Sequence, residues 1–182
     1  MTHLLDLLII IDIESTCWEG DPPVGEESEI IEIGICTYDI ARGERVEKES
    51  VFVLPETSSI SEFCTELTSI TPAMVKNKGM PFNEACAMLR KKYKSKDRTW
   101  GSWGDYDRAQ FERQCIRLGI GYPFGRTHIN LKNLFALQNK LTREPGMEHA
   151  LKLLNLPLEG THHRAGDDAW NIGGIVEMML KK

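Results

Sequence analysis

Paired cysteines are missing from this sequence of 182 residues. Its five cysteines are Cys17, Cys36, Cys64, Cys86 and Cys115. They are odd in number and show no short paired spacing, which argues against a disulfide framework and against a zinc knuckle. The pattern therefore favours reduced thiols in a cytoplasmic protein.

Membrane-spanning and export segments are missing as well. No apolar run is long enough to cross a bilayer as a helix. The N-terminal residues are apolar, but they lack a basic region and include Asp6, which does not fit a signal peptide. A glycine-rich phosphate loop and internal repeats are also not found. We expect no contact with a membrane and one globular α/β domain over residues 1–182, in which 41% of the residues are hydrophobic.

A surplus of positive charge is the third missing feature. The formal net charge is −5, whereas a surface that binds nucleic acid is normally basic. Acids gathered in a metal site would weaken this objection, because bound divalent ions offset their charge. The basic run from Arg90 to Lys96 suits either contact with a phosphate backbone or a solvated helix end.

The segment from Leu4 to Glu14, LLDLLIIIDIE, dominates what the sequence does contain. Its apolar run suits a central β-strand covered on both faces. The run ends in Asp12 and Glu14, and side chains two residues apart on a strand point to the same face. Keeping two carboxylates together away from water is costly unless a cation lies between them, and oxygen ligands suit Mg²⁺ or Mn²⁺. A solvated strand end is the alternative.

The rest of the chain predicts a five-stranded mixed sheet flanked by helices. A turn at 41–44 joins the second and third strands into a meander that begins at the first strand. The other strands are expected at 30–38, 45–54, 98–103 and 126–129. Helices are expected near 61–64 and 71–72, and at 81–93, 105–118, 130–141, 147–154 and 165–180.

Two later segments carry further acids. Asp105 and Asp107 follow the fourth expected strand, and Asp105 suits either a helix cap or a metal ligand. If the first and fourth strands are parallel neighbours, this pair arrives beside Asp12, because ligands gather at the carboxyl ends of parallel strands. Residues 162–168, HHRAGDD, lead into the last helix and offer histidines and acids together.

These motifs resemble the DEDDh group of 3′→5′ exonucleases, which have a ribonuclease-H-like fold. Asp12, Glu14, Asp107, His163 and Asp168 match its five active-site positions. The likeness extends to the subgroup of histone-mRNA 3′ exonucleases and KapD-like proteins. The matching segments are FCTELTSIT at 63–71, GSWGDYD at 101–107 and DDAWNI at 167–172.

Two positions in this match have a neighbouring alternative. Asp107 is preferred to Asp105 because a short helical stretch ending in Phe111 follows it, as in the family. His162 and Asp167 keep the same offset as His163 and Asp168, but the segment 167–172 aligns its second Asp with the family's ligand. The extra acid at Asp105 departs from the family pattern.

The resemblance implies a mechanism with two divalent cations, Mg²⁺ or Mn²⁺. Asp12 would bridge both ions, Glu14 and Asp168 would bind the first, and Asp107 would hold the second. His163 would be the general base that deprotonates the attacking water. The substrate would be the 3′ end of a single-stranded nucleic acid, RNA in preference to DNA, and the product a nucleoside 5′-monophosphate.

Further residues match positions near the substrate. Phe63, Leu67, Thr68 and Tyr106 belong to the matching segments, and Cys17 and Trp18 follow the first acid motif. Aromatic and apolar side chains grip single-stranded ends by stacking and wedging. Packing in the core is the alternative for Phe63 and Leu67, and anchoring of a loop is the alternative for Trp18.

Two other functions fit parts of the pattern. A catalytically weak, KapD-like binding or regulatory module would share the fold, but it should have lost an acid or the histidine, and this chain keeps all five. A phosphoesterase acting on a small nucleotide is less favoured, because no phosphate loop is present.

Overall fold

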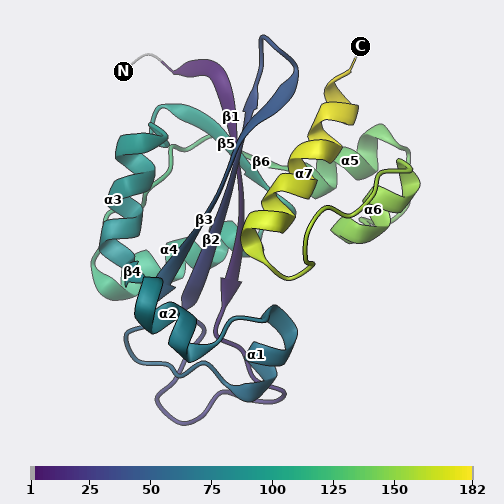
Figure 1. The fold of residues 1–182 in the computed structure, drawn as a ribbon. Coiled ribbons are helices and arrows are strands. Elements are labelled where there is room, and N and C mark those ends of the chain that lie inside the picture. The colour runs from purple at the N-terminus through teal and green to yellow at the C-terminus, as the bar shows by residue number, and fades with distance from the viewer. Residues whose placement is uncertain (1–2, 182) are drawn as a thin grey trace.

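The computed structural model describes residues 3–181 and contains one mixed β-sheet with helices on both faces (Figure 1). The strands lie in the order β4-β3-β2-β1-β5-β6. The antiparallel pairs are β1 with β2 and β2 with β3, and the parallel pairs are β1 with β5, β5 with β6 and β3 with β4. The expected mixed sheet flanked by helices is therefore confirmed, with β1 inside it.

Strand β1, Leu4–Ser15, alternates between the two faces of the sheet. Ile9, Ile11 and Ile13 pack in one core cluster, whereas Leu8 and Ile10 pack in another. A strand with apolar side chains on both faces must be covered on both, and this is why its sequence reads as a continuous apolar run. The two clusters form the two main layers of the core.

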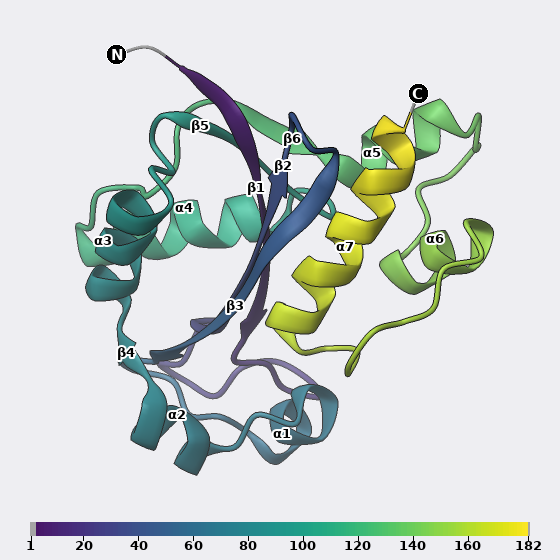
Figure 2. The same ribbon diagram turned by 45° about the horizontal axis from the view of Figure 1, so that its top comes forward.

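Helices α3 (Phe82–Lys92) and α4 (Tyr106–Leu118) cover the first of these faces. Helices α5 (Leu131–Gln138), α6 (Met147–Leu153) and α7 (Ala165–Leu180) cover the second. Figure 2 shows α7 lying along the sheet on the side opposite α3 and α4. The boundaries agree with the expected helices to within a few residues at each end.

Strands β2 (Ile30–Asp39) and β3 (Glu44–Leu54) form the expected hairpin. Beyond the meander, β5 (Arg98–Ser102) and β6 (His128–Asn130) extend the sheet on the other side of β1. Helices α1 (Glu62–Thr68) and α2 (Pro72–Lys78) pack over a small third cluster at one end of the sheet. The C-terminal ends of β1 and β5 point to one edge, because these strands are parallel.

The expected strand count of five is wrong, because the sheet has six strands. The extra strand, β4, consists of Met80–Pro81 and pairs with the end of β3. The sequence pattern places Pro81 at the start of a helix, but that helix begins at Phe82. Two residues are too short to show alternation, and a proline is tolerated at a sheet edge because its missing N–H is not needed there.

Within the described residues, all five cysteines are free thiols, in agreement with the expectation from their spacing. None of the helices in residues 3–181 combines the length and the apolar character needed to cross a membrane.

Candidate active site

Three carboxylates converge where β1 ends. Oxygen atoms of Asp12, Glu14 and Asp168 all lie within 4.8 Å of one another. Asp12 and Glu14 project from the same face of β1, as their spacing predicts, and Asp168 lies in the first turn of α7. Residues far apart in the sequence therefore form one oxygen-rich cluster. Such a cluster suits a hard divalent cation.

Close contact between α7 and β2 brings Asp168 to this cluster. A Cβ atom built on Gly34 would lie 1.8 Å from the carbonyl oxygen of Ala165. Only a residue without a side chain lets the helix begin directly against the strand. Because Gly34 is the register partner of Asp12 on the neighbouring strand, the start of α7 lies beside the acids of β1.

Glu32 is a buried acid that the sequence motifs do not single out. It is the register partner of Glu14, and its side chain is fully buried. It accepts hydrogen bonds from the Arg164 guanidinium, at 2.8 and 3.2 Å, and from the Ala165 backbone N–H, at 2.9 Å. These bonds fix the first residues of α7 beside the acidic cluster. The available signal in the sequence is one acid inside the apolar run of β2.

Asp107 reaches the same region from the opposite side of the sheet. It is buried in the first turn of α4, and its Oδ1 accepts a hydrogen bond of 3.0 Å from the Ile13 N–H. This bond ties it to the backbone of β1 between Asp12 and Glu14. Asp107 is nevertheless not one of the three closely spaced acids.

Asp105 does not belong to this cluster. It stands at the N-cap position of α4, but its side chain makes no capping hydrogen bond. Instead it accepts a hydrogen bond of 2.9 Å from Asn130 and lies 3.4 Å from Arg108 and 3.9 Å from His128. The capping role considered for Asp105 is therefore wrong, because these partners hold its carboxylate away from the helix N–H groups.

Burial raises the pKa values of Asp12, Glu14, Asp107 and Asp168, and repulsion from neighbouring acids adds to the effect for Asp12 and Glu14. Burial is the largest cause for all four, and it raises the pKa of Glu14 to about 8 and that of Asp107 to about 7. Burial together with the neighbouring acids raises the pKa of Asp12 well above its usual value, and burial raises that of Asp168. A cation between these groups would favour their charged forms.

Both histidines lie against Asp168. His162 Nδ1 is 3.0 Å from Asp168 Oδ2, and the His163 backbone N–H donates to the same oxygen at 3.0 Å. The two imidazole rings stack with their centroids 4.0 Å apart. Burial lowers the pKa of His163, and the neighbouring His162 lowers it further.

The neighbouring acid Asp167 has other partners. It forms an ion pair with Lys48 and accepts a hydrogen bond of 2.7 Å from the Thr161 N–H. Its carboxylate is therefore engaged outside the cluster, whereas Asp168 belongs to it. This favours Asp168 as the ligand in the last motif.

The predicted substrate-contact residues are divided between surface and interior. Phe63 and Leu67 of α1 are 38% and 41% exposed, and Tyr106 is 54% exposed. These three side chains are available to a ligand. Thr68 is buried, and its hydroxyl donates to the Cys64 carbonyl and accepts from the Ile70 N–H.

Cys17 and Trp18 follow β1 and are half-buried. The Cys17 carbonyl accepts a hydrogen bond of 2.6 Å from the Ser61 hydroxyl, which connects the loop after β1 to α1. The indole N–H of Trp18 is buried and has no hydrogen-bond partner within the described protein. The structure thus connects this loop to α1, the helix that carries the exposed Phe63 and Leu67.

Similar sequences are found among known 3′-5′ exonucleases. The 3′-5′ exonuclease Snipper of Drosophila melanogaster is 29% identical to this chain over an alignment of 196 positions. The alignment covers 96% of this chain and 69% of Snipper. The human 3′-5′ exoribonuclease 1 is 31% identical over 97% of this chain. This chain spans only 53% of that protein, and 29% of the human ERI1 exoribonuclease 2.

Solved structures show the same fold. The nuclease domain of 3′hExo, a DEDDh family member bound to rAMP, matches with a TM-score of 0.87 and 27% identity. The match covers 99% of this chain and 94% of that domain. A full-length 3′-exonuclease matches with a TM-score of 0.85 and 28% identity, over 96% of this chain and 81% of the other. The ribonuclease-H-like fold expected from the sequence is therefore confirmed.

The family comparison covers both acid motifs and the histidine segment. The exonuclease model RNase_T matches residues 9–176. This range begins within β1 and ends near the end of α7, so it includes every element that contributes to the acidic cluster. The protein belongs to the RNase_T family of 3′-5′ exonucleases.

Proposed function

We propose that this protein removes nucleotides one at a time from the 3′ end of a single-stranded nucleic acid, RNA in preference to DNA, and releases nucleoside 5′-monophosphates. The observation that carries the proposal is the convergence of Asp12, Glu14 and Asp168 beside His163 in an exonuclease-family fold. The relatives support the choice of RNA, because two are named exoribonucleases and one solved neighbour is bound to rAMP.

The donor set fits two divalent cations, Mg²⁺ or Mn²⁺. All the candidate ligand atoms in the acidic cluster are carboxylate oxygens, which suit these ions. Asp12, Glu14 and Asp168, together with Asp107, would hold these ions. When bound, such ions lower the pKa of a coordinated water and polarise the phosphodiester.

His163 would accept the proton of the attacking water. Its pKa lies below the usual value, because burial and His162 disfavour the charged ring. The imidazole is then neutral near pH 7 and able to act as a base. Its neighbour His162 stacks on the ring and holds Asp168, which makes His162 a positioning residue in this account.

The exposed side chains beside the cluster would hold the terminal nucleotide. Phe63 and Leu67 would contact the last base, with Thr68, Cys17 and Trp18 shaping the same end of the site. Tyr106 would contact the strand next to Asp107. Aromatic stacking on each base contributes about 1–3 kcal/mol and tolerates any sequence.

A gel time course tests this function. Single-stranded RNA and DNA of the same sequence, each labelled at the 5′ end, would be incubated with Mg²⁺, Mn²⁺ or a chelator. We expect a ladder that shortens by one nucleotide at a time, faster for RNA, and no reaction with the chelator. If neither substrate shortens while metal binds, the binding-module alternative is favoured.

A further inference from the structure

A pocket that does not include the clustered acids is lined by cations. It has a volume of about 310 Å³ and lies at the β6 side of the sheet, between α4 and the segment that leads into β6. The basic and aromatic residues that line it include Lys96, Trp100, Arg108, Tyr122, Arg126 and His128.

The charges of this basic pocket are poorly balanced. Lys96 and Arg126 are exposed, and neither forms an ion pair within residues 3–181. Arg108 is 3.4 Å from Asp105, and Glu112 is the acid among the lining residues. In a protein with a net charge of −5, two cations that pair with no acid of the described chain, beside an Arg108 already paired with Asp105, make a local site for an anion.

Two residues that line the pocket also carry buried hydrogen-bond donors without acceptors among the described residues. Trp100 is completely buried and stacks on Phe124 at 4.1 Å, yet its indole N–H has no partner within the described protein. The buried hydroxyl of Tyr122 has none either. Buried donors without acceptors cost free energy. Both donor atoms are closed to solvent, so an anion in the pocket does not reach them directly. Lys96 and Arg126, exposed and unpaired within the described chain, are therefore the groups available to an anion.

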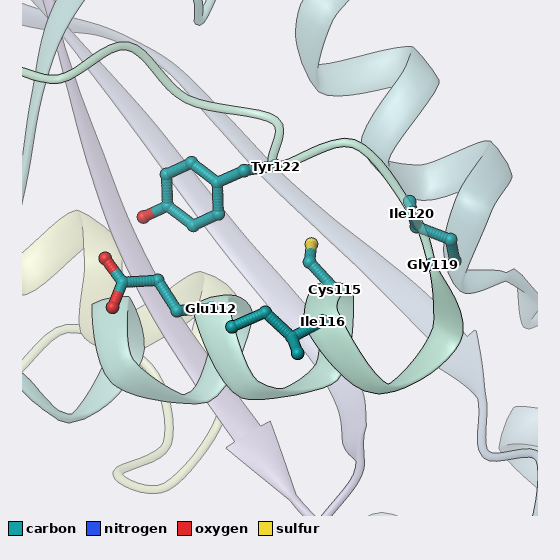
Figure 3. Close-up of a pocket in the computed structure, with 6 residues that line it drawn as sticks. All are labelled: Glu112, Cys115, Ile116, Gly119, Ile120 and Tyr122. Carbon is teal, nitrogen blue, oxygen red and sulfur yellow. The ribbon is translucent and has the colours of Figure 1, made fainter.

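The adjacent pocket provides a contrast. It has a volume of about 440 Å³ and shares Glu112 and Tyr122 with the basic pocket. Figure 3 shows its other side chains, Cys115, Ile116 and Ile120, with no cation among the residues drawn. We therefore expect an anion to bind in the basic pocket and not in this adjacent one.

Helix α4 connects the basic pocket to the candidate active site. Arg108 directly follows Asp107 in the first turn of this helix. On the strand side, His128 Nε2 lies 2.9 Å from the hydroxyl of Ser102, the last residue of β5. The pocket thus begins beside the place where β5 ends and the acids gather.

We propose that the basic pocket binds a backbone phosphate of the nucleic-acid strand, upstream of the bond that is cut. This inference rests on the proposed exonuclease function and adds a second contact point to it. The strand would be held at its terminal nucleotide by the acidic cluster and α1, and at an upstream phosphate by Lys96 and Arg126. The pocket would not increase the affinity for a substrate that is too short to reach it.

The test compares affinities for long and short RNA. An Asp12→Asn background prevents cutting, and fluorescence anisotropy then reports the binding of labelled dinucleotide and 12-nucleotide RNA. Lys96→Ala with Arg126→Ala should weaken binding of the 12-mer about 5- to 50-fold. The slope of log K against log salt should fall by about 0.7 for each phosphate that the protein no longer neutralises. Binding of the dinucleotide should not change.

Two control variants separate the pocket from general charge. Lys91→Ala removes an exposed lysine of α3 that does not line the pocket, and it should leave the 12-mer affinity unchanged. Trp100→Phe keeps an aromatic ring and removes an N–H that is closed to solvent, and it should also leave the 12-mer affinity unchanged. Circular dichroism would confirm that each variant is folded.

The possible outcomes separate this proposal from the proposed function. Unchanged 12-mer affinity in the double variant, an equal loss for the dinucleotide, or an equal loss in Lys91→Ala would overturn the phosphate site. The anisotropy measurement does not depend on hydrolysis. A wild-type protein that fails to shorten RNA, together with a double variant that binds the 12-mer more weakly, would contradict the exonuclease function and support the pocket.

Discussion

At the residue scale, the candidate active site is a group of half-buried and buried carboxylates that lie close to one another. Asp12, Glu14 and Asp168 repel one another, and burial raises their pKa values. A folded protein keeps such a cluster at a cost in stability, and functional sites are where that cost is usually found. The neighbouring Glu32 differs, because Arg164 and the Ala165 N–H satisfy its buried charge.

The two histidines give the first residue-scale prediction. His163→Ala should reduce kcat about 10²- to 10⁴-fold, because it removes the proposed general base. Metal affinity should change little, since this account places the ions on carboxylates. Single-turnover hydrolysis of RNA and calorimetric titration with Mn²⁺ would measure the two effects.

His162→Ala is the matched control for this prediction. It removes the ring that contacts Asp168 while leaving His163 in place. We expect a smaller loss of kcat than in His163→Ala. A larger loss in His162→Ala would show that the assignment of the two histidines is reversed.

At the scale of the elements, the site depends on how closely α7 approaches β2. Any side chain at position 34 would overlap the carbonyl of Ala165. Glu32 accepts hydrogen bonds from Arg164 and Ala165 at the start of the helix. Strand β2 therefore provides both the space for the start of α7, at Gly34, and the hydrogen bonds that fix it, at Glu32. The position of Asp168 follows from these two contacts.

Gly34→Ala should therefore destabilise the protein and weaken metal binding together. Forcing the helix start away from the strand should lower the free energy of unfolding by about 1–3 kcal/mol or more. Gly20→Ala is the control, because a Cβ there meets nothing within 4 Å, and we expect a change within about 0.5 kcal/mol. Urea unfolding and Mn²⁺ titration measure both effects. Equal stability of the two variants would refute the close-contact explanation.

The elements also show what a sequence can predict. The apolar run of β1 and the helical pattern of α7 are long and periodic, and the structure confirms both elements. The acids of β1 lie on one face as predicted, since alternation along a strand is a local property. Strand β4 could not be predicted, because two residues carry no periodicity.

Features that depend on pairing between elements could not be predicted either. Glu32 matters because the register places it opposite Glu14, and neither strand alone contains that information. The partners of Asp105 come from α4 and β6, which are brought together only by the fold. The basic pocket likewise combines Lys96, at the end of the basic run, with residues from later segments.

At the scale of the whole molecule, the acidic cluster makes stability depend on pH and metal. Burial raises the pKa of Glu14 to about 8 and that of Asp107 to about 7, well above the values of the unfolded chain. Between the unfolded and folded pKa values, the metal-free folded protein binds more protons than the unfolded chain does. Its stability therefore falls as the pH rises.

We expect the Tm of the metal-free protein to fall between pH 6.5 and pH 8.5. The lowered pKa values of His128 and His163 act in the opposite direction, but this effect is complete once the histidines of the unfolded chain, whose usual pKa is about 6.5, have lost their protons. A loss of 1 kcal/mol corresponds to about 2–4 °C for a protein of this size. Saturating Mn²⁺ should raise the Tm and flatten the pH dependence, because the ions replace the protons. Calorimetry with chelator that shows a constant or rising Tm would contradict this prediction.

The central claim is that the acids of β1, α4 and α7 bind two divalent cations. Calorimetric titration of Mn²⁺ into the metal-free protein measures the number of ions directly. We predict that the wild type binds two ions per chain. The Asp12→Asn variant should bind Mn²⁺ more than about 100-fold more weakly, because Asp12 is a proposed metal ligand. Binding of no ion by the wild type, or unchanged binding by Asp12→Asn, would contradict the account.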